Sequence, residues 1–439
     1  MASTKISRTS GTPTSNKTFT ISYWVKRSNI GSAGNGHIFD TFVDSSNRSQ
    51  IHFDDDNVID FRLAVSGTNI GRLKTNRVFR DSSAWLHIVA TIDTTLSTAD
   101  DRIKLYVNGV QETSFSTRIN PSQNADFAMG GTHTLGAYGG GSNYFDGTLS
   151  HFHFTDGYAY APSTFGETDS TSGIWKPKTA PSVTYGTNGF FLKFENSGNL
   201  DLDSSGNNLT FATSGTLTQN VDTPSNNFAT INTLNIVATG LTVSNGNLSI
   251  TGNTGDAWRS LPATFGVSSG KYYYECKIKS FNTGLHLGII DYSQVPNSNA
   301  YAYQYSRAYM YKDDGNKANN NSSTSYGNSF TTNDIIGVAL DLDNGKIYFS
   351  KNGTYQNSGD PTSGATGTGS AFDITSGYDY TPVFSTNNTA DQIEYNFGGG
   401  YFGTTAVASA GTAPSQGGIF EYNCPNGYQA LCTKGINSF

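Results

Sequence analysis

The sequence predicts an all-β protein made of two antiparallel, jelly-roll-like β-sandwiches that an irregular connector joins. Its 439 residues exceed the length of one average domain. Aromatic residues make up 13% of the chain and charged residues only 14%, while Gly, Asn and Ser interrupt the apolar runs. This composition is typical of short strands and turns, because long amphipathic helices need many charged residues at helical spacing.

The first predicted domain spans residues 1–166. It opens with the strand FTISYWVKR, in which Ile21, Tyr23 and Val25 alternate onto one face. Six further strand-like runs follow: HIFDTFVD, SQIHFDD, VIDFRLAV, WLHIVATID, RIKLYVNG and GTLSHFHFTDGYAY. Their short, regular spacing predicts an antiparallel sandwich.

Residues 167–234 differ in character and are predicted to form an ordered connector. The stretch WKPKTAPSVTYGTNG contains two prolines, and FFLKFENSGNLDLDSSGNNLTF contains two short strand-like pieces around Gly and Asn turns. The connector is therefore expected to pack on a domain as short strands and loops.

The second predicted domain spans residues 235–439, where strand-like alternation resumes. Its clearest element is the hairpin IIGVALDLDNGKIYFSKNG. A two-residue type I′ turn at Asn344-Gly345 would pair Asp343 with Lys346 and Leu340 with Phe349. The apolar side chains then share a core face, and the acidic ones form a solvated face.

A similar hairpin occurs in the first domain. In WLHIVATIDTTLSTADDRIKLYVNG, one face carries Ile88, Ala90 and Ile92 of the first strand and Ile103, Leu105 and Val107 of the second. Both hairpins end in an Asn-Gly pair, at Asn108 and Asn352, which is expected to turn the chain out of the second strand.

Several of these runs resemble known families. FTISYWVKR, WLHIVATIDTT, DRIKLYVNGV and LGAYGGGSNYFDGTLSHFHFTDGYAYAP resemble laminin-G-like, concanavalin-type jelly rolls. GKYYYECKIKS, HLGIID, the hairpin and TPVFS resemble a SPRY domain in that family's order. The combination, with SGNNLTF, DTPSNNF and NGYQALCTK, is similar to structural proteins of marine tailed bacteriophages. The resemblance implies a fibre, appendage or decoration protein of the virion.

The SPRY resemblance implies protein binding through loops at one end of the sandwich. Long polar loops run through residues 293–329 and 354–380, and long loops in compact β domains are often binding elements. Tyrosine gives large, rigid contacts at low entropy cost. The candidate recognition residues are Tyr301, Tyr303, Tyr305, Tyr309, Tyr378 and Tyr380. The alternative is that these tyrosines pack between strands or against a neighbouring subunit.

The laminin-G-like resemblance implies a sugar site, which in that family sometimes uses Ca²⁺. An aromatic platform with Asn and Asp occurs in the loop YGGGSNYFDG as Tyr138, Asn143, Tyr144 and Asp146. The alternative is an ordinary loop before the last strand.

Two acidic stretches have oxygen ligands for calcium, and no other cofactor is expected. Asp54 and Asp56 alternate onto one face, as do Asp201 and Asp203. Calcium takes 6–8 oxygens and neither stretch contains a full EF-hand loop, so ordinary acidic turns are the alternative.

Catalytic motifs are missing from the sequence, and the protein is predicted not to be an enzyme. It contains no nucleophile elbow, phosphate loop or zinc motif. His151 and His153 share a face without an evident third metal ligand. The concanavalin-type motif Glu-x-Asp-x-x-Glu is absent and Glu275 stands alone, although glycosidases need only two carboxyls about 5–10 Å apart.

The net charge and the N-terminal sequence limit which classes of partner and which cellular locations are expected. The net charge is −7 and no basic cluster occurs, which disfavours a nucleic-acid partner. The start MASTKISRTSGTPTSN is not a secretory signal, and no run is long enough to span a membrane. Cys276 is expected to be a buried hydrophobe, and a Cys424–Cys432 bridge is an option.

These observations predict a non-enzymatic structural protein on a virion surface, made in the host cytoplasm. Its expected partners are other virion proteins and a host surface glycan or protein. The phage resemblance implies a homo-oligomer, commonly a trimer. The alternatives are a secreted or cell-surface lectin-like adhesin and a glycan depolymerase.

Overall fold

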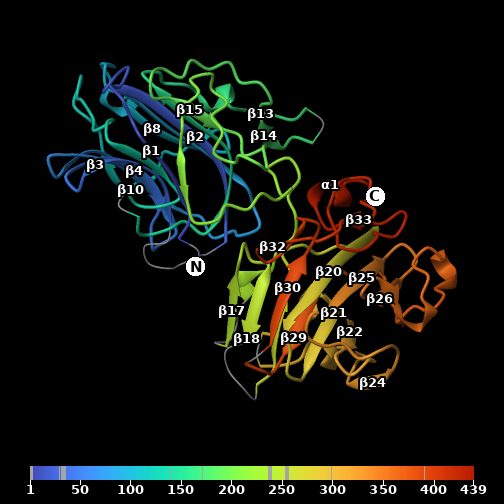
Figure 1. The fold of residues 1–439 in the computed structure, drawn as a ribbon. Helices are drawn as coiled ribbons and strands as arrows, with labels where there is room; N and C mark the ends of the chain where they lie inside the picture. The colour runs from blue at the N-terminus through green and yellow to red at the C-terminus, as the bar shows by residue number, and fades with distance from the viewer. Residues whose placement is uncertain are drawn as a thin grey trace. The chain divides into compact units, whose positions relative to one another are not determined.

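The computed structural model describes residues 3–28, 30, 36–139, 141–170, 172–235, 240–252, 257–297, 299–389 and 391–439. The chain divides into unit 1, Met1–Gln219, and unit 2, Asn220–Phe439. Each unit contains two large β-sheets with an apolar core of its own, which confirms the all-β prediction (Figure 1). No helix of the described residues is long and apolar enough to cross a membrane.

Unit 1 pairs an eight-stranded with a six-stranded sheet, both antiparallel. In spatial order the first contains β10 (Phe115–Ile119), β6 (Thr68–Val78), β5 (Val58–Val65), β4 (Asn47–Phe53), β3 (His37–Asp44), β11 (Thr132–Leu135), β1 (Lys5–Thr9) and β16 (Ala212–Ser214). The second contains β15 (Phe190–Leu192), β12 (Gly147–Asp156), β2 (Thr18–Arg27), β7 (Leu86–Asp93), β8 (Ile103–Val107) and β9 (Val110–Gln111). The smaller elements are β13 (Gly166–Thr168), β14 (Trp175–Pro177), η1 (Ala99–Asp101) and η2 (Pro162–Thr164).

Unit 2 has the same two-sheet plan. Its larger sheet contains β17 (Leu241–Ser244), β18 (Ser249–Gly252), β30 (Gln392–Asn396), β20 (Lys271–Ser280), β25 (Ile335–Asp341), β26 (Lys346–Lys351), β27 (Thr354–Tyr355), β28 (Phe372–Asp373) and β33 (Gln429–Ala430). The other contains β19 (Arg259–Pro262), β29 (Tyr380–Thr386), β21 (Leu285–Asp291), β22 (Ala308–Lys312), β23 (Asn316–Asn319) and β24 (Ser322–Ser325). The remaining elements are β31 (Tyr401–Phe402), β32 (Thr405–Ala406), η3 (Thr233–Asn235), η4 (Tyr292–Gln294), η5 (Ala302–Gln304), η6 (Gln356–Ser358), η7 (Gly364–Thr366) and α1 (Thr433–Ile436).

The predicted core faces of unit 1 are observed. Ile21, Tyr23 and Val25 of β2 are buried in the apolar core. The hairpin β7–β8 pairs Ala90 with Leu105, as its alternation requires. Its six apolar residues, Ile88, Ala90, Ile92, Ile103, Leu105 and Val107, are all buried.

The predicted connector, residues 167–234, is divided between the two units. Residues 167–219 lie in unit 1, where β15 extends the six-stranded sheet and β16 extends the eight-stranded one. The remainder lies in unit 2, where Phe228 bridges to Cys432 and Ile231 to Ala263. The connector therefore contributes to both sandwiches.

The predicted register of the second hairpin is wrong by two residues. Leu340 faces Ile347 and Asp341 faces Lys346, so residues 342–345 form a four-residue loop. The cause is Asp341, whose carboxylate accepts hydrogen bonds from the backbone N of Asn344 at 3.0 Å and from its Nδ2 at 2.8 Å. Because the shift is even, the predicted apolar residues still share one face.

The type I′ turns occur at the other Asn-Gly pairs. Asn108 and Gly109 have φ of 49° and 80°, and Asn352 and Gly353 have 49° and 79°. Positive φ at both central residues defines this turn and favours Asn-Gly. Each pair joins the second hairpin strand to a short third strand, β9 or β27, which confirms the predicted turn.

The outer face of the second hairpin is buried, so the prediction of a solvated acidic face is wrong. Asp341 and Tyr348 each have 0% exposure. Phe420, Tyr428 and Ala430 of the C-terminal segment form an apolar cluster on this face with Tyr348. Sequence periodicity could not predict that the C-terminal segment covers this face of the hairpin, because that segment contains few strand residues.

The three cysteines are buried and free. Cys276 has 0% exposure and packs in the core of unit 2, as predicted. The optional Cys424–Cys432 bridge is not formed in this structure.

Candidate functional site

The eight-stranded sheet of unit 1 has one apolar face in the core and one polar face, which we call the outer face. Alternation along β4, β5 and β6 places Ile51, Phe61 and Leu73 in the core. The residues between them point the other way. The outer face consists of Asp40, Arg48, Gln50, His52, Asp60, Arg62, Arg72 and Lys74.

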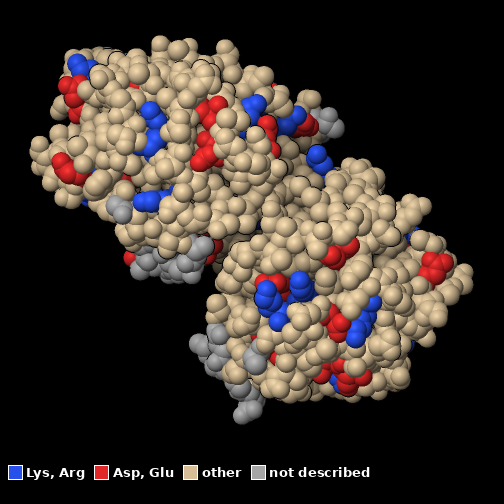
Figure 2. Space-filling view, in the orientation of Figure 1, with Lys and Arg blue, Asp and Glu red and all other residues tan. Residues whose placement is uncertain are grey.

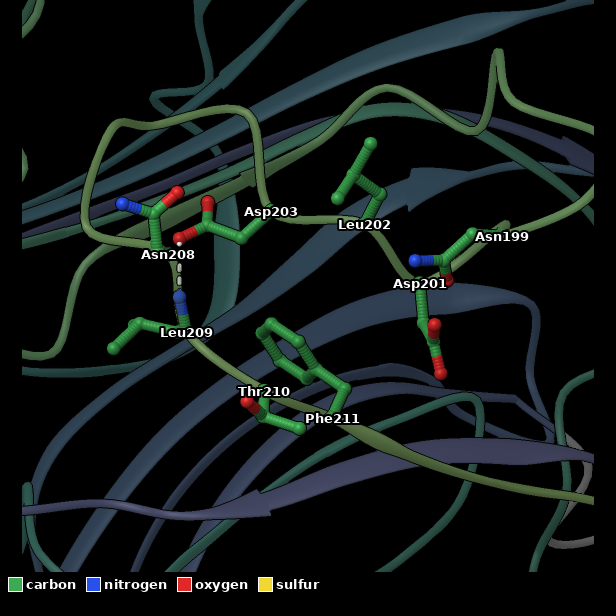
Figure 3. Close-up of a pocket in the computed structure, with 8 residues that line it drawn as sticks. All are labelled: Asn199, Asp201, Leu202, Asp203, Asn208, Leu209, Thr210 and Phe211. Carbon is green, nitrogen blue, oxygen red and sulfur yellow. Dashed lines mark hydrogen bonds between the residues drawn. The ribbon is translucent and has the colours of Figure 1, made fainter.

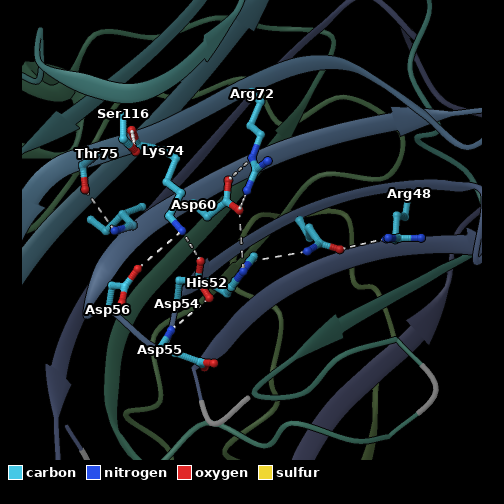
Figure 4. A network of polar contacts seen from close by, with 12 residues as sticks. Arg48, His52, Asp54, Asp55, Asp56, Asp60, Arg72, Lys74, Thr75 and Ser116 are labelled. Atoms are coloured by element: carbon cyan, nitrogen blue, oxygen red, sulfur yellow. Dashed lines mark hydrogen bonds and ion pairs between the residues drawn. The ribbon is translucent and has the colours of Figure 1, made fainter. Parts of the chain in front are cut away.

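A chain of polar contacts crosses the outer face from strand to strand (Figure 4). Arg72 donates to both carboxylate oxygens of Asp60, at 3.0 and 2.7 Å. Gln50 accepts from Nε of Arg48 at 2.9 Å, and its Nε2 lies 3.4 Å from Nδ1 of His52. These contacts hold planar donor and acceptor groups side by side.

Two histidines at this face are neutral. The rings of His37 and His52 stack with centroids 4.5 Å apart and an interplanar angle of 1°. Burial and the neighbouring His52 lower the pKa of His37 to about 3. Burial also lowers the pKa of His52, against the opposing effect of Asp60. Neutral imidazoles each offer one donor and one acceptor nitrogen.

Several buried polar atoms of the outer face, and of the neighbouring His37 and Thr134, have no hydrogen-bond partner among the described residues. They are Oδ1 of Asp40, Nε of Arg62, Nδ1 of His37 and Oγ1 of Thr134. Burial raises the pKa of Asp40 to about 6, although Gly139 N donates to its other oxygen at 2.9 Å. Unpaired buried polar atoms cost free energy, so their concentration here marks a functional candidate.

One of the four predicted sugar-site residues lies at the outer face. The ring of Tyr138 meets His37 edge to face at 5.2 Å, and the guanidinium of Arg48 lies 5.8 Å from its centroid. Asn143 is exposed, and Tyr144 and Asp146 are half-buried. No hydrogen bond of the described residues joins these three to the polar chain, and burial raises the pKa of Asp146.

The first predicted calcium pair is occupied by a lysine. Nζ of Lys74 lies 2.6 Å from Asp54 and 3.8 Å from Asp56. Burial acts to raise the pKa of Asp54, but hydrogen bonds from Lys74 and the backbone of Asp55 lower it overall. The ammonium group therefore takes the place that a cation would need.

The second predicted calcium pair, Asp201 and Asp203, borders a pocket of about 210 Å³ in unit 1. The two carboxylates point apart (Figure 3). Asp201 accepts from the hydroxyl of Thr213 at 2.7 Å, whereas Asp203 accepts from Ser205 and from backbone N–H groups, including that of Leu209 at 3.0 Å. Within the described ranges no three or more His, Cys, Asp or Glu side chains are grouped as a metal site. Calcium binding remains a prediction.

The predicted tyrosines of unit 2 separate into two groups. Tyr309 and Tyr380 are buried in the core, where both hydroxyls bond Thr375, at 3.1 and 2.7 Å. Burial removes these two from the predicted recognition surface, in agreement with the alternative of packing between strands. The others, Tyr301, Tyr303, Tyr305 and Tyr378, are partly exposed, and Arg307 lies 4.0 Å above the ring of Tyr378.

A serine–histidine pair in unit 1 has the wrong geometry for a nucleophile and its base. Oγ of Ser22 lies 2.9 Å from Nε2 of His87. Nε1 of Trp175 donates to Nδ1 of the same imidazole at 2.9 Å. An indole N–H only donates, so Nδ1 is the acceptor and Nε2 carries the proton. His87 therefore donates to Ser22 and cannot accept its proton.

None of the eight residues of the outer face was predicted from the sequence, although Tyr138, Asp54 and Asp56, which contact it, were predicted site residues. The available signal was the polar residue at every second position of SQIHF, VIDFRLAV and GRLKT. Each run alone indicates a solvated face. Only the pairing of β3, β4, β5 and β6 assembles them into one surface.

Family models match both units. Residues 2–163 match the concanavalin A-like lectin/glucanases superfamily, and residues 271–400 match the SPRY domain. These matches cover the regions in which the sequence resemblances were found.

Among curated proteins, the chain is similar to the ATP-dependent RNA helicase DDX1 of Xenopus laevis. The identity is 31% over 106 residues, which are 22% of this chain and only 12% of the helicase. Among solved structures, the SPRY domain of human HERC1 is 23% identical with a TM-score of 0.29, covering 35% of this chain and 91% of that domain. The structure of stonustoxin is 16% identical with a TM-score of 0.30, and the match covers 38% of this chain and 27% of that chain. The two family matches show that the chain carries a concanavalin A-like domain followed by a SPRY domain, both of them β-sandwiches.

Proposed function

We propose that the protein is a non-enzymatic recognition and assembly protein of a phage virion surface, acting as a fibre, appendage or decoration subunit. It is made in the host cytoplasm and assembles with other virion proteins, as a homo-oligomer. Two binding-type sandwiches in one chain support this role. The observation that carries the recognition part is the outer face of unit 1, with its unpartnered polar atoms.

The outer face suits a host surface glycan better than a protein. Its donors and acceptors alternate across three strands, and Tyr138 adds an aromatic ring. Glycans present many hydroxyl groups, each of which both donates and accepts. Nε of Arg62 and Oδ1 of Asp40 are buried without a hydrogen-bond partner among the described residues, which leaves one donor and one acceptor unsatisfied at this face.

A glycan array with the full chain tests this recognition. We expect binding that the variant Arg62→Gln weakens, because the guanidinium donors are lost. The array is run with about 1 mM Ca²⁺ and with a chelator, the range in which weak extracellular calcium sites bind. Equal binding with Ca²⁺ and with the chelator shows that the interaction does not need calcium. No binding to any glycan contradicts recognition through this face.

The virion role is tested on phage particles that lack the protein. Electron microscopy is expected to show a missing surface feature, and adsorption to host cells is expected to fall. Intact-looking particles with normal adsorption would contradict the role. A reducing-end assay on host polysaccharide is expected to show no release of sugar, and release would favour a depolymerase.

A further inference from the structure

Four aromatic side chains of unit 2 contact one another as a closed set, which we call the aromatic quartet: Trp258, His286, Tyr301 and Tyr303. Trp258 stacks on His286 at 4.5 Å, and Tyr301 stacks on Tyr303 at 4.3 Å. Edge-to-face contacts join the two stacks at 5.3 Å between Trp258 and Tyr301 and at 5.0 Å between His286 and Tyr303. Such pairs hold one another in fixed orientations.

The quartet is built on the outer side of the six-stranded sheet of unit 2. His286 lies in β21 between the core residues Leu285 and Leu287, so its ring points away from the core. The loop that carries both tyrosines is fixed to the sheet. Oγ of Ser260 donates to the carbonyl of Ala300 at 2.8 Å, and the backbone N of Ala302 donates to Oγ of Ser385 at 3.0 Å.

The quartet is open to solvent and uncharged. Trp258, Tyr301 and Tyr303 are partly exposed, while His286 is buried beneath them. Burial and the neighbouring Lys312 lower the pKa of His286 to about 3, which leaves the imidazole neutral. Lys312 itself pairs with Asp314 at 2.9 Å, so these two charges offset each other.

Polar groups border the exposed rings. The hydroxyl of Tyr301 donates to Oδ1 of Asn321 at 3.1 Å, which orients that exposed amide beside the ring. The side chains of Asn387 and Trp258 both lie against Gly284. Nδ1 of His286 is buried and has no hydrogen-bond partner in the described part of the chain. An apolar platform with a few oriented polar groups is typical of small-molecule sites.

We propose that the aromatic quartet is a second recognition site and that it binds a neutral pyranose of a glycan. A pyranose has C–H groups on its faces, which stack on Trp258 and Tyr301, and hydroxyls at its rim, which meet Asn321 and Asn387. The four rings carry no charge, and the neighbouring Lys312 is paired with Asp314. This site lies in unit 2 and does not depend on the outer face of unit 1.

Tryptophan fluorescence gives a specific measurement for this site. The four tryptophans are Trp24, Trp85, Trp175 and Trp258, so only Trp258 lies in unit 2. The full chain is titrated with neutral gluco-, manno- and galacto-oligosaccharides. We expect one class to change the fluorescence, and we expect Trp258→Phe to abolish that change. Calorimetry of the same titration measures affinity independently of the signal.

Substitutions separate stacking from hydrogen bonding. Tyr301→Ala is expected to weaken binding about two- to tenfold, the effect of losing one aromatic contact. Tyr301→Phe keeps the ring, so its affinity is expected to stay within about twofold. Tyr292→Ala removes a tyrosine of unit 2 that is 46% exposed and lies in none of the predicted sites, so it is the matched control, with unchanged affinity expected. Thermal unfolding of each variant checks the fold.

Three results would overturn the proposal. In the first, no neutral oligosaccharide binds; in the second, one binds but Tyr301→Ala and Trp258→Ala leave its affinity unchanged. In the third, a peptide binds the quartet and no sugar does. Binding that Arg62→Gln removes and Trp258→Ala preserves would place the sugar on the outer face of unit 1. That result would contradict the quartet site and leave the proposed function standing.

Discussion

Asp60 lies 1% exposed in the middle of the outer face, where Arg72 donates to both of its oxygens. Nε2 of His52 lies 3.9 Å from the same carboxylate. A buried carboxylate with a bidentate guanidinium partner positions the groups around it. Asp60 is thus a structural support for the residues that face a ligand.

We predict that Asp60→Asn lowers the free energy of unfolding by about 1.5–3 kcal/mol, the range for hydrogen bonds to charged groups. The amide cannot accept both donors of Arg72. Urea unfolding followed by circular dichroism measures the change. Asp56→Asn is the control, because that side chain is 79% exposed, and a change below about 0.5 kcal/mol is expected there. Equal effects of the two substitutions would contradict the supporting role of Asp60.

At the scale of single elements, the hairpin β25–β26 depends on one buried carboxylate. Asp341 bonds Asn344 in the loop, and Nζ of Lys271 on β20 lies 3.0 Å from its Oδ2. It therefore shapes the loop and joins two neighbouring strands. The residue that looked like part of a solvated face sets the register instead.

Asp341→Ala is expected to destabilise unit 2 by about 2–3 kcal/mol, because it leaves loop donors and a lysine without their acceptor. Thermal or urea unfolding measures this loss. In Asp373→Ala a surface pair with Lys346 is lost, and a change below about 1 kcal/mol is expected because Asp373 is 83% exposed. A loss of similar size in both variants would argue against the register role.

The C-terminal segment is attached to unit 2 through Glu275 of β20. Its carboxylate accepts from the backbone N of Glu421 at 2.8 Å, from that of Tyr422 at 2.9 Å and from the hydroxyl of Tyr273 at 3.0 Å. Burial raises the pKa of Glu275 to about 7, and these hydrogen bonds act in the opposite direction. The carboxyl group that sequence analysis left without a role therefore holds a covering segment.

This attachment predicts a pH dependence. The ordinary pKa of 4.5 is lower than the folded value of about 7, so folding favours the protonated form. Its contribution is complete below pH 4.5 and is lost as the pH rises through 7, by up to about 3 kcal/mol. Glu275→Gln does not titrate, and we expect it to flatten this fall in urea-unfolding curves recorded from pH 4.5 to 8. A wild-type fall that persists in the variant would contradict the assignment.

At the scale of the whole molecule, 34 Asp and Glu residues stand against 27 Lys and Arg residues. Figure 2 shows acidic and basic side chains next to one another on the visible face of each unit, with large uncharged areas between. The net charge of −7 agrees with the mixed surface. A mixed surface without a basic cluster disfavours polyanionic partners such as nucleic acids.

Unit 1 contains buried neutral histidines whose protonation opposes folding. Burial lowers the pKa of His37 and His87 to about 3, and that of His133 to about 4. Their stabilising contribution is fully present above pH 6.5, the pKa of an unfolded histidine. It is lost as the pH falls from 6.5 towards the folded pKa values of about 3 to 4. We expect the urea midpoint of unit 1 to decrease steadily below pH 6.5.

Tryptophan fluorescence of the Trp258→Phe variant reports the unfolding of unit 1 alone, because the three remaining tryptophans all lie in unit 1. His87→Gln is the informative variant, with a smaller decrease on acidification expected. A midpoint that stays constant from pH 6.5 to 4 would contradict the role of the buried imidazoles.

The sequence by itself determined the fold class, the two sandwiches, the core faces of β2, β7 and β8, and the Asn-Gly turns at 108 and 352. These features depend on local periodicity and turn chemistry, which neighbouring residues specify. The identity of the SPRY-like unit also depended on local runs such as GKYYYECKIKS.

Only the tertiary structure decided which polar residues converge and which surfaces are covered. Pairing of β3, β4, β5 and β6 gathers Asp40, Gln50 and Arg62 on one face. Tyr380 is buried in strand β29 whereas Tyr301 in its loop stays partly exposed, and the C-terminal segment covers Tyr348. The physical reason is that alternation separates the two sides of a strand, whereas contacts between residues distant in sequence decide which side meets solvent.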